Sequence, residues 1–500
     1  MKVQPNRFTA TRIAFLFALV AAAFSAAKAQ GVAPPCVPGT ARDDAVMEWN
    51  CRTVKYALSP TFGGALRQIR AMAVVHLSVH NAVNGITGEY ETYSRNLANV
   101  PPAGASADAA AIGAAYQSLY GIVNSAQRTQ LDAELAASLA SRGIAANDPS
   151  LAYGRNEGQN VVNMRTGDGS GPEAQCAYAD NLDPQPGDWV RILNVDTNTT
   201  PAAATPCWRF VPPFVLGRAD QFPLADPPSL QSGEYVRDLQ EVRIFGGQDN
   251  TARQDWQSRI ADFWDGPPVG ITNQAVRQAA AARPMSLSDR ARALALVYVV
   301  GTDASIACWH YKYTKLFWRP ETAINNSVPL PRGRYWKPYL FPSHPHPEYP
   351  SGHSTNSGAM FSAAALAFGD EPGITMTPTI TRNGVSVTPQ WESFSEGINE
   401  VIVARIYSGL HFRFTDERSA ELGTQIAEYI HANQFRKCSS GISCAGGSAR
   451  RDSKRGRPLS RLSTVPPVPW VGLLSGGEEN QGRLIPPAEL ENACVHPARP

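Results

Sequence analysis

Three short segments of the chain contain residue types that could hold a tetrahedral oxyanion. They are residues 312–320 (KYTKLFWRP), 350–353 (PSGH) and 405–411 (RIYSGLH). Together they offer four basic residues, a glycine amide beside a serine hydroxyl, and two histidines. Cations and amide N–H groups bind an oxyanion through charge-assisted hydrogen bonds, and a histidine can exchange a proton with it or attack it. If the fold brings these segments together, they form one chemical site.

The first segment is expected to carry its cations on one side of a helix. Steps of three, four and seven residues return to nearly the same helical face, so Lys312, Lys315 and Arg319 should form a stripe. Three stacked cations repel one another unless an anion or acidic side chains lie opposite. Pro320 is expected to stop the helix, which leaves Arg319 at its C-terminal rim. A basic surface stripe is the simpler interpretation of this segment alone, but the aromatic residues around it argue against full solvation.

The second segment is predicted to be the start of a helix. Pro350, Ser351, Gly352 and His353 precede a run of small and apolar residues from 354 to 368. Free N–H groups and the helix dipole make such a start an anion cradle, and glycine lets the backbone approach a ligand closely. Ser351 adds a hydroxyl donor, and His353 would face the bound group as a general acid or base. A capped helix start with a structural histidine is the alternative.

The third segment combines a helix end with another cation and histidine. Gly409 can end or kink the helix, so that Arg405 and His411 face the same cleft. Asp416 follows closely enough to orient His411 through its second ring nitrogen. The alternatives are Glu417 for the orienting acid and Arg413 for the cation.

Together the three segments resemble the type 2 phosphatidic acid phosphatase and vanadium-dependent haloperoxidase superfamily, and most of all its soluble bacterial haloperoxidase-like members. The pattern of that superfamily reads K-x6-R-P, then P-S-G-H, then S-R-x3-G-x-H-x3-D, and the chain matches it in this order. Ala404 stands where the family usually has serine. Thr415 occupies the usual aspartate position, with Asp416 one residue later, so the residue that orients His411 stays open.

The resemblance implies a role for each matching residue. Vanadate, or phosphate in the phosphatase branch, would be held by Lys312, Arg319, Ser351, Gly352 and Arg405. His411 would be the axial nitrogen and the only protein ligand of the metal, and His353 would be the acid/base catalyst. The resemblance also implies that Asp265 supplies an acid paired to the site arginines.

The same residues serve two reactions in this superfamily. A haloperoxidase would use hydrogen peroxide to oxidise chloride or bromide, which then halogenates a small organic acceptor. A secreted acid phosphatase would attack phosphorus with His411, form a phosphohistidine, and protonate the leaving alcohol with His353. Trp309 resembles a tryptophan of fungal-type chloroperoxidases, whereas His346 lies where bromoperoxidases tend to have histidine, although it could be an ordinary loop residue. We expect a haloperoxidase, with the phosphatase and a non-catalytic helical scaffold as alternatives.

Apolar spacings of three and four residues predict an all-α fold, which agrees with the helix bundles and long Pro/Gly-rich loops that the resemblance implies. A hairpin around Asn383 and Gly384 (residues 380–388) and an extended loop from 167 to 230 are the expected exceptions. The expected helices are residues 64–83, 106–123, 127–141, 232–244, 256–264, 286–317, 354–368, 391–407 and 416–433. The expected parts of the chain are a signal peptide (1–29), an N-terminal helical region with the loop (30–230), a catalytic core (231–436) and a partly basic, loop-rich tail (437–500).

The first 29 residues predict export to the periplasm or the extracellular space. A basic leader, an apolar run and the small-x-small sequence Ala-Lys-Ala are typical of a cleaved signal peptide, with an uncleaved anchor as the alternative. No integral membrane span is expected in the mature chain. The leader carries four of the 45 basic residues and no acidic one, which leaves 41 against 43 acidic residues. That balance gives no support for nucleic-acid binding, and the oligomeric state is left open.

All eight cysteines follow the leader, and an even number in an exported protein favours disulfides. Cys438–Cys444 is the expected local pair, with Cys36–Cys51 and Cys176–Cys207 as further candidates. Cys308 lies in an apolar helical stretch, where a buried free thiol is at least as plausible.

Overall fold

The computed structural model describes residues 44–93, 100–171, 176, 178–249, 252–328, 330 and 334–438. The predicted signal peptide and the predicted tail beyond residue 438 lie outside this range. The described residues are mostly helical, as expected, with a single two-stranded sheet among them. In the N-terminal half the helices are α2 (Ala45–Ala57), α3 (Ala65–Thr87), α4 (Ala107–Ile122), α5 (Ser125–Ser141), α6 (Pro149–Met164) and a short 3-10 helix (Pro206–Phe210).

The C-terminal half contains the remaining elements. Its helices are α7 (Gly233–Phe245), α8 (Asp255–Phe263), α9 (Pro268–Ala282), α10 (Leu287–Lys315), α11 (Pro320–Ser327), α12 (Gly352–Phe368), α13 (Phe394–Tyr407) and α14 (Arg413–Asn433), and the hairpin consists of β1 (Ile380–Arg382) and β2 (Val385–Val387).

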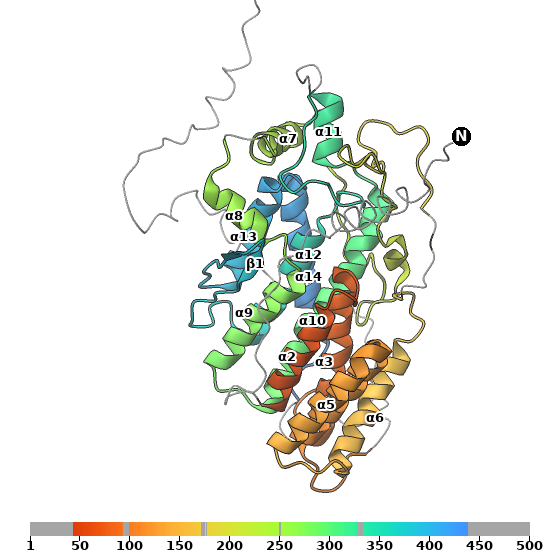
Figure 1. Cartoon of the computed structure of the whole chain (residues 1–500), viewed down its shortest axis with the longest axis vertical. Helices are drawn as coiled ribbons and strands as arrows, with labels where there is room; N and C mark the ends of the chain where they lie inside the picture. The colour runs from red at the N-terminus through yellow and green to blue at the C-terminus, as the bar shows by residue number, and fades with distance from the viewer. Residues whose placement is uncertain are drawn as a thin grey trace, which may run out of the picture. The chain divides into compact units, whose positions relative to one another are not determined.

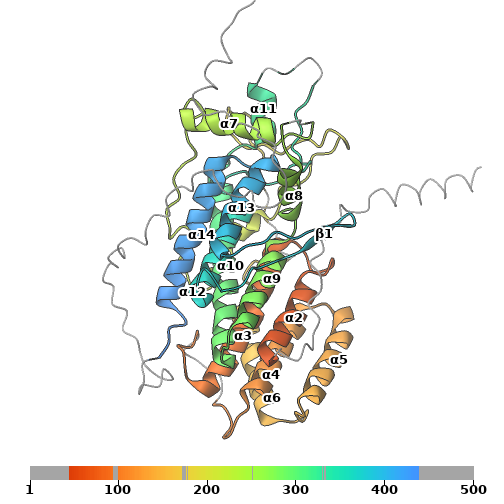
Figure 2. The ribbon, with the colours of Figure 1, turned by 90° about the vertical axis from the view of Figure 1, so that its left-hand side faces the viewer.

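Helix α10 is the centre of the described structure. It begins with a capping box at Ser286, and it packs against α3 on one side and against α12 and α14 on the other. In Figure 2, α2–α6 gather at the bottom, α7 and α11 lie at the top, and α10 runs between them. Among the described helices, α10 alone has the length and hydropathy to cross a bilayer, and 94% of its apolar window is buried inside the protein. The helix therefore forms the core against which the other helices pack.

The predicted end of this helix is wrong in one respect. Helix α10 stops at Lys315, because Leu316 takes the left-handed conformation (φ 48°). Pro320 does not terminate α10; it starts α11, where a fixed φ and a missing N–H are tolerated. Arg319 is consequently the N-cap residue of α11, and it does not continue the stripe of Lys312. Lys315 points elsewhere and forms an ion pair with Asp226.

The other expected helices and the hairpin are present, with end points that differ by a few residues. In the hairpin, Ile380 pairs with Val387 and Arg382 with Val385. Asn383 and Gly384 both have positive φ (49° and 79°), which the two-residue turn of a twisted hairpin requires. Helices α2, α6, α9 and α11 were not predicted. Figure 1 shows the hairpin, labelled at β1, below α8 and α13.

A buried carboxylate of α10 helps to hold the loop from 167 to 230 against this helix. Asp303 is fully buried and accepts the backbone N–H groups of Phe214 (2.6 Å), Val215 (2.8 Å) and Leu216 (2.9 Å). Buried backbone N–H groups need an acceptor, so one aspartate fixes three consecutive residues of an otherwise irregular segment.

We expect Asp303→Ala to lower the free energy of unfolding by at least about 3 kcal/mol, because it leaves three buried N–H groups without an acceptor at roughly 1–3 kcal/mol each. Asp303→Asn keeps one acceptor oxygen and should lose less. Urea unfolding followed by circular dichroism measures both. A variant Asp303→Ala as stable as the wild type would show that the loop is held by other contacts.

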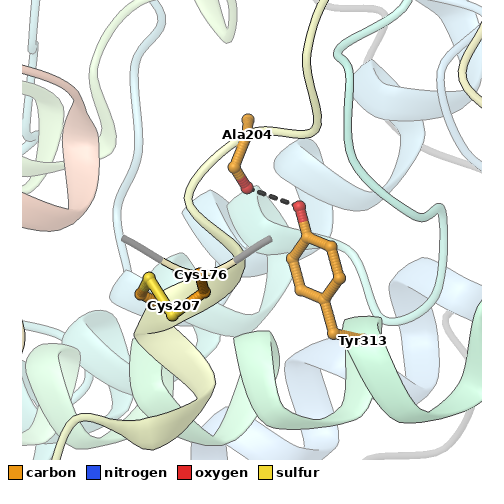
Figure 3. Close-up of a disulfide and its surroundings, with 4 residues drawn as sticks. All are labelled: Cys176, Ala204, Cys207 and Tyr313. Carbon is orange, nitrogen blue, oxygen red and sulfur yellow. Dashed lines mark hydrogen bonds between the residues drawn. A yellow bond between two sulfur atoms is a disulfide. The ribbon is translucent and has the colours of Figure 1, made fainter. Parts of the chain in front are cut away.

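The same loop carries a disulfide between Cys176 and Cys207. Three residues before Cys207, the carbonyl of Ala204 accepts a hydrogen bond of 2.5 Å from the hydroxyl of Tyr313 on α10, as Figure 3 shows. The predicted Cys176–Cys207 bond is therefore confirmed, and so is the free, buried state of Cys308. In each of the other expected pairs one cysteine, Cys36 or Cys444, lies outside the described residues.

Candidate active site

Helix ends and turns bring the three sequence segments to one buried place. Lys312 lies in the last turn of α10, Ser351 is the N-cap residue of α12, and Gly409 (φ 77°) turns the chain after α13. Arg319 and Arg405 are the longest side chains involved. All three cations are fully buried, and His411 is only 1% exposed. Buried charges require partners, so this cluster is not a solvated basic stripe.

Arg319 connects two histidines. Its Nη1 donates to Nε2 of His411 (3.3 Å) and to the carbonyl of Leu410 (3.0 Å). Its Nη2 lies 2.9 Å from Nδ1 of His346, and its Nε donates to the carbonyl of the same residue. An arginine can only donate, so Nε2 of His411 presents a lone pair rather than a proton. We call the group formed by His411, Lys312, Arg319 and Arg405 the cage.

The other ring nitrogen of His411 binds Glu348. Nδ1 donates to Oε1 of Glu348 over 2.8 Å, which gives His411 the tautomer with a proton on Nδ1. The backbone N–H of Phe412 also donates to Oε1, and the Thr415 hydroxyl donates to Oε2. Burial raises the pKa of Glu348 to about 8 and lowers the pKa of His411 well below 6.5, with the nearby cations adding to the second effect. Because His411 is neutral, its contact with Glu348 is a hydrogen bond that fixes the ring and not an ion pair between two full charges.

The prediction that Asp416 orients His411 is wrong. Asp416 accepts a 2.6 Å hydrogen bond from the hydroxyl of Ser354, in the first turn of α12. The alternative acid, Glu417, lies near Arg413. Glu348 was missed because it comes from the loop before PSGH, far from His411 in sequence. One feature of the sequence could have indicated Glu348. Thr415 replaces the aspartate of the superfamily pattern, and its hydroxyl donates a hydrogen bond to Glu348.

Lys312 is held by backbone carbonyls. Its ammonium group donates to the carbonyls of Pro347 (2.8 Å) and Glu348 (3.0 Å), so two of its three protons are used. Burial is the main cause that lowers the pKa of Lys312 to about 7. The ammonium also lies 5.7 Å from the centre of the Trp309 ring. An anion bound beside Lys312 would favour its charged form.

This low pKa predicts how anion binding depends on pH. Without a bound anion, Lys312 is charged below about pH 7 and neutral above it. Phosphate affinity should therefore fall as the pH rises from roughly 6 to 9, and it should fall less in Lys312→Arg, because arginine stays charged. Calorimetric titrations at several pH values measure this, and the ionisation of phosphate itself affects both proteins equally. Identical slopes for the two proteins would contradict the role of Lys312.

Arg405 is the cation with unused donors. Its Nη1 donates to the carbonyl of Trp264 over 2.9 Å, while its buried Nε and Nη2 have no hydrogen-bond partner. A buried, unsatisfied N–H group is costly, which indicates that these donors are arranged for a ligand. The alternative cation, Arg413, is engaged in an ion pair of 2.5 Å with Glu241.

Asp265 lies near the cage but pairs with a different arginine. The resemblance implied a pairing with the site arginines, whereas the structure places Oδ2 of Asp265 2.8 Å from Nη1 of Arg382 on β1. The implied ion pair between Asp265 and a site arginine is therefore wrong, because among the described residues Asp265 pairs with Arg382. Asp265 follows Trp264, which contacts Arg405, and its negative charge partly offsets the effect of burial on the pKa of Arg405.

His353 lies in the first turn of α12, and its buried Nε2 has no hydrogen-bond partner. Burial lowers the pKa of His353 well below 6.5, the charge of Arg405 lowers it further, and a hydrogen bond to the carbonyl of Gly266 opposes both. His353 is therefore neutral near pH 7, and the nitrogen that it presents is unprotonated.

The N-terminus of α12 completes the site. The hydroxyl of Ser351 caps the helix at Ser354, and the N–H of Ser351 donates to the hydroxyl of Ser419. The next amides, of Gly352 and His353, belong to the first turn of the helix, where no intrahelical acceptor exists. A Cβ at position 352 would lie 3.3 Å from the Trp309 ring, so glycine keeps this cradle open.

Aromatic rings form one wall beside the cage. Trp309 lies 5.4 Å from the ring of His346, and its Nε1 donates to the hydroxyl of Thr205 in the long loop. His346 also stacks on His344 at 5.7 Å. His346 thus contacts both Arg319 and the aromatic wall, and it is more than an ordinary loop residue.

These residues fit a tetrahedral oxyanion such as vanadate or phosphate. The unused donors of Arg405, the third proton of Lys312 and the first amides of α12 can bind oxygen atoms, and Nε2 of His411 offers a lone pair. Within the described part of the chain, no group of three His, Cys, Asp or Glu residues is arranged to chelate a metal cation.

Comparison with known proteins adds independent observations. Residues 292–439 match the family model of the second helical-bundle domain of vanadium chloroperoxidase. The vanadium chloroperoxidase of Curvularia inaequalis is 27% identical over 307 residues, which are 47% of this chain and 50% of that protein. The match thus spans about half the length of that curated relative.

Solved structures share the fold over a larger part of the chain. A bacterial vanadium-dependent iodoperoxidase superposes with a TM-score of 0.64 at 22% identity, covering 79% of this chain and 97% of that one. The apo and holo forms of a bacterial vanadium-dependent chloroperoxidase have TM-scores of 0.57 and 0.56, at 17% and 18% identity. They cover 75% and 76% of this chain and 95% and 94% of theirs.

Proposed function

We propose that the chain belongs to the superfamily of vanadium-dependent haloperoxidases and type 2 phosphatidic acid phosphatases, and that it is a haloperoxidase that uses vanadate and hydrogen peroxide to oxidise bromide or chloride. The observation that carries the proposal is the cage, in which the charges of Lys312, Arg319 and Arg405 all act on His411. The match to a vanadium chloroperoxidase supports the oxidative branch of the superfamily.

In this proposal the cage residues would hold vanadate, and Nε2 of His411 would be the nitrogen that binds it. Lys312, Arg319, Arg405 and the first turn of α12 (Ser351 and Gly352) neutralise its oxygen atoms and donate hydrogen bonds. Bound vanadate supplies a Lewis-acid centre at which hydrogen peroxide becomes electrophilic towards halide. Overall, hydrogen peroxide is reduced to water, and the halide is oxidised by two electrons to hypohalous acid with uptake of one proton.

The side chains of the protein have separate tasks in this reaction. The Nη1 of Arg319, which contacts Nε2 of His411, would be free to donate to an oxygen atom of the anion once that nitrogen binds it. Glu348 keeps the proton of His411 on Nδ1 throughout. His353, neutral and with a bare Nε2, accepts a proton from hydrogen peroxide and returns it to the water that leaves.

Halide oxidation and phosphate-ester hydrolysis distinguish the two branches of the superfamily. Purified protein with vanadate, hydrogen peroxide and bromide or chloride should halogenate a phenol dye, and the rate should disappear after vanadate is removed and return when it is restored. Phosphate should compete with vanadate, because both are tetrahedral oxyanions. Hydrolysis of a simple phosphomonoester by the vanadate-free protein, without halide oxidation under any of these conditions, would favour the phosphatase and overturn the proposal.

We also propose that the protein is exported and acts on a small organic acceptor outside the cytoplasm. The leader has the form of a signal peptide, and the disulfide between Cys176 and Cys207 is of a kind that persists in oxidising compartments. Detection of a mature N-terminus near residue 30 in the periplasm or the medium tests this, whereas full-length protein in the cytoplasm would contradict it.

A further inference from the structure

The segment between α8 and α9 lies outside the cage and brings a carboxylate, that of Asp265, close to it. The segment that connects α8 and α9 contacts two of the site residues: the carbonyl of Trp264 accepts from Arg405, and the carbonyl of Gly266 accepts from His353. Asp265 lies between Trp264 and Gly266 in the chain, and its charge acts on Arg405, whose buried Nε and Nη2 have no hydrogen-bond partner. A carboxylate in this position could occupy the donors that a bound oxyanion needs.

In the structure Asp265 instead faces outward to the hairpin. Nη1 of Arg382, on β1, lies 2.8 Å from Oδ2 of Asp265 and 3.4 Å from Oδ1 of Asp262. The side chains of Arg382 and Asp265 are only 15% and 21% exposed, so the interaction is shielded from solvent to a large extent. An ion pair of this kind is stronger than one at the surface.

The hairpin that carries Arg382 is fixed in place. The side-chain amide of Gln274 on α9 forms two hydrogen bonds with the backbone of Thr379, one to the carbonyl (3.0 Å) and one from the N–H (2.9 Å). Buried Ile380 packs on Gly266, where an added Cβ would lie 3.0 Å from its Cδ1. Both views place the hairpin close to α8 (Figures 1 and 2). Arg382 is thus held against the segment that lines the cage.

We propose that Arg382 is a positioning residue for oxyanion binding, which holds the Asp265 carboxylate away from Arg405 and so keeps the unpartnered Nε and Nη2 of Arg405 available to the ligand. Arg382 itself does not touch the ligand. This inference rests on the proposed function, because it requires that the cage binds vanadate or phosphate. It predicts that Asp265 becomes an internal competitor of the ligand once Arg382 is removed.

Phosphate binding to the full-length protein, measured by calorimetry, tests this without any catalytic step. Arg382→Ala should weaken phosphate binding by about tenfold, the size expected of a coupling between neighbouring charges. Asp265→Asn should bind at least as tightly as the wild type, because it removes a negative charge near the anion. The double variant Arg382→Ala, Asp265→Asn should recover most of the loss, since no competitor is left.

Two controls separate this from a structural effect of the hairpin. Arg382→Lys keeps the charge and should retain most of the affinity. Thr381→Ala, on the same strand, removes only a hydroxyl contact with Ser386 and should bind like the wild type.

The outcomes are distinguishable from failure of the proposed function. If the wild type binds neither phosphate nor vanadate, the proposed function fails and this inference with it. If the wild type binds phosphate, the inference alone is overturned by an Arg382→Ala variant with unchanged affinity, or by a double variant as weak as Arg382→Ala. The second result would mean that Arg382 acts by shaping the segment 264–266 and not by restraining Asp265.

Discussion

Replacement of His411 by alanine should abolish vanadate-dependent halide oxidation. We expect the rate to fall on the order of 10³-fold or more, because removing one member of a group of residues that act as a unit costs about as much as removing the whole group. Nε2 of His411, which Arg319 contacts, is the lone pair that the proposed function assigns to the bound anion. Halide-oxidation kinetics, together with vanadate binding by calorimetry, measure the effect.

A matched control for this variant lies on α10. His310→Ala also removes a histidine near the site, but that ring contacts Tyr311 and not the cage. It should keep nearly full activity. Circular dichroism and the melting temperature show whether His411→Ala is folded. A folded His411→Ala variant that retains more than a few per cent of the activity would show that the ligand binds elsewhere.

The second large effect is expected at Glu348. Glu348→Ala removes the acceptor of Nδ1 of His411, so the ring is free to change tautomer or to rotate, and Nε2 is no longer held bare. Loss of a group that orients a ligand residue typically costs about 10–100-fold in affinity or activity. Glu348→Gln keeps an acceptor oxygen and should lose less. Vanadate affinity and the rate of bromide oxidation should fall together.

Asp416→Asn is the sharpest comparison for Glu348. The sequence pattern favours Asp416 as the orienting acid, whereas the structure shows it bound to Ser354. Asp416→Asn should therefore lose less affinity than Glu348→Ala. The opposite order would restore the expectation from sequence and contradict the hydrogen bond seen between His411 and Glu348.

The cage could be predicted from sequence because its residues follow short, fixed spacings. Lys312, Ser351 and His411 come from motifs in which one helix end or turn decides where the side chain points. Arg319 was placed at the wrong helix end, since the left-handed conformation of Leu316 and the new start at Pro320 depend on tertiary packing. Glu348 and Arg382 could not be predicted, because their partners are distant in sequence and only the fold brings them together.

For one of the unpredicted helices, α6, small residues give a physical explanation. Its Gly154 packs so closely on α4 that a Cβ would lie 2.0 Å from the carbonyl of Ala110. Where two helix backbones touch, the contact positions are occupied by small residues such as glycine. The sequence then lacks the regular spacing of large apolar residues that predicts a helix. In contrast, α10 and α14 bury large apolar side chains, and their spacing predicted them.

The central claim is that the three segments form one site in which His411 binds an oxyanion through Nε2. A crystal structure of the protein with vanadate tests it most directly, because the anomalous signal of vanadium locates the ion. We expect vanadium bonded to Nε2 of His411, with oxygen atoms within hydrogen-bonding distance of Arg405 and Lys312. Vanadium bonded to another residue, or an empty cage at saturating vanadate, would contradict it.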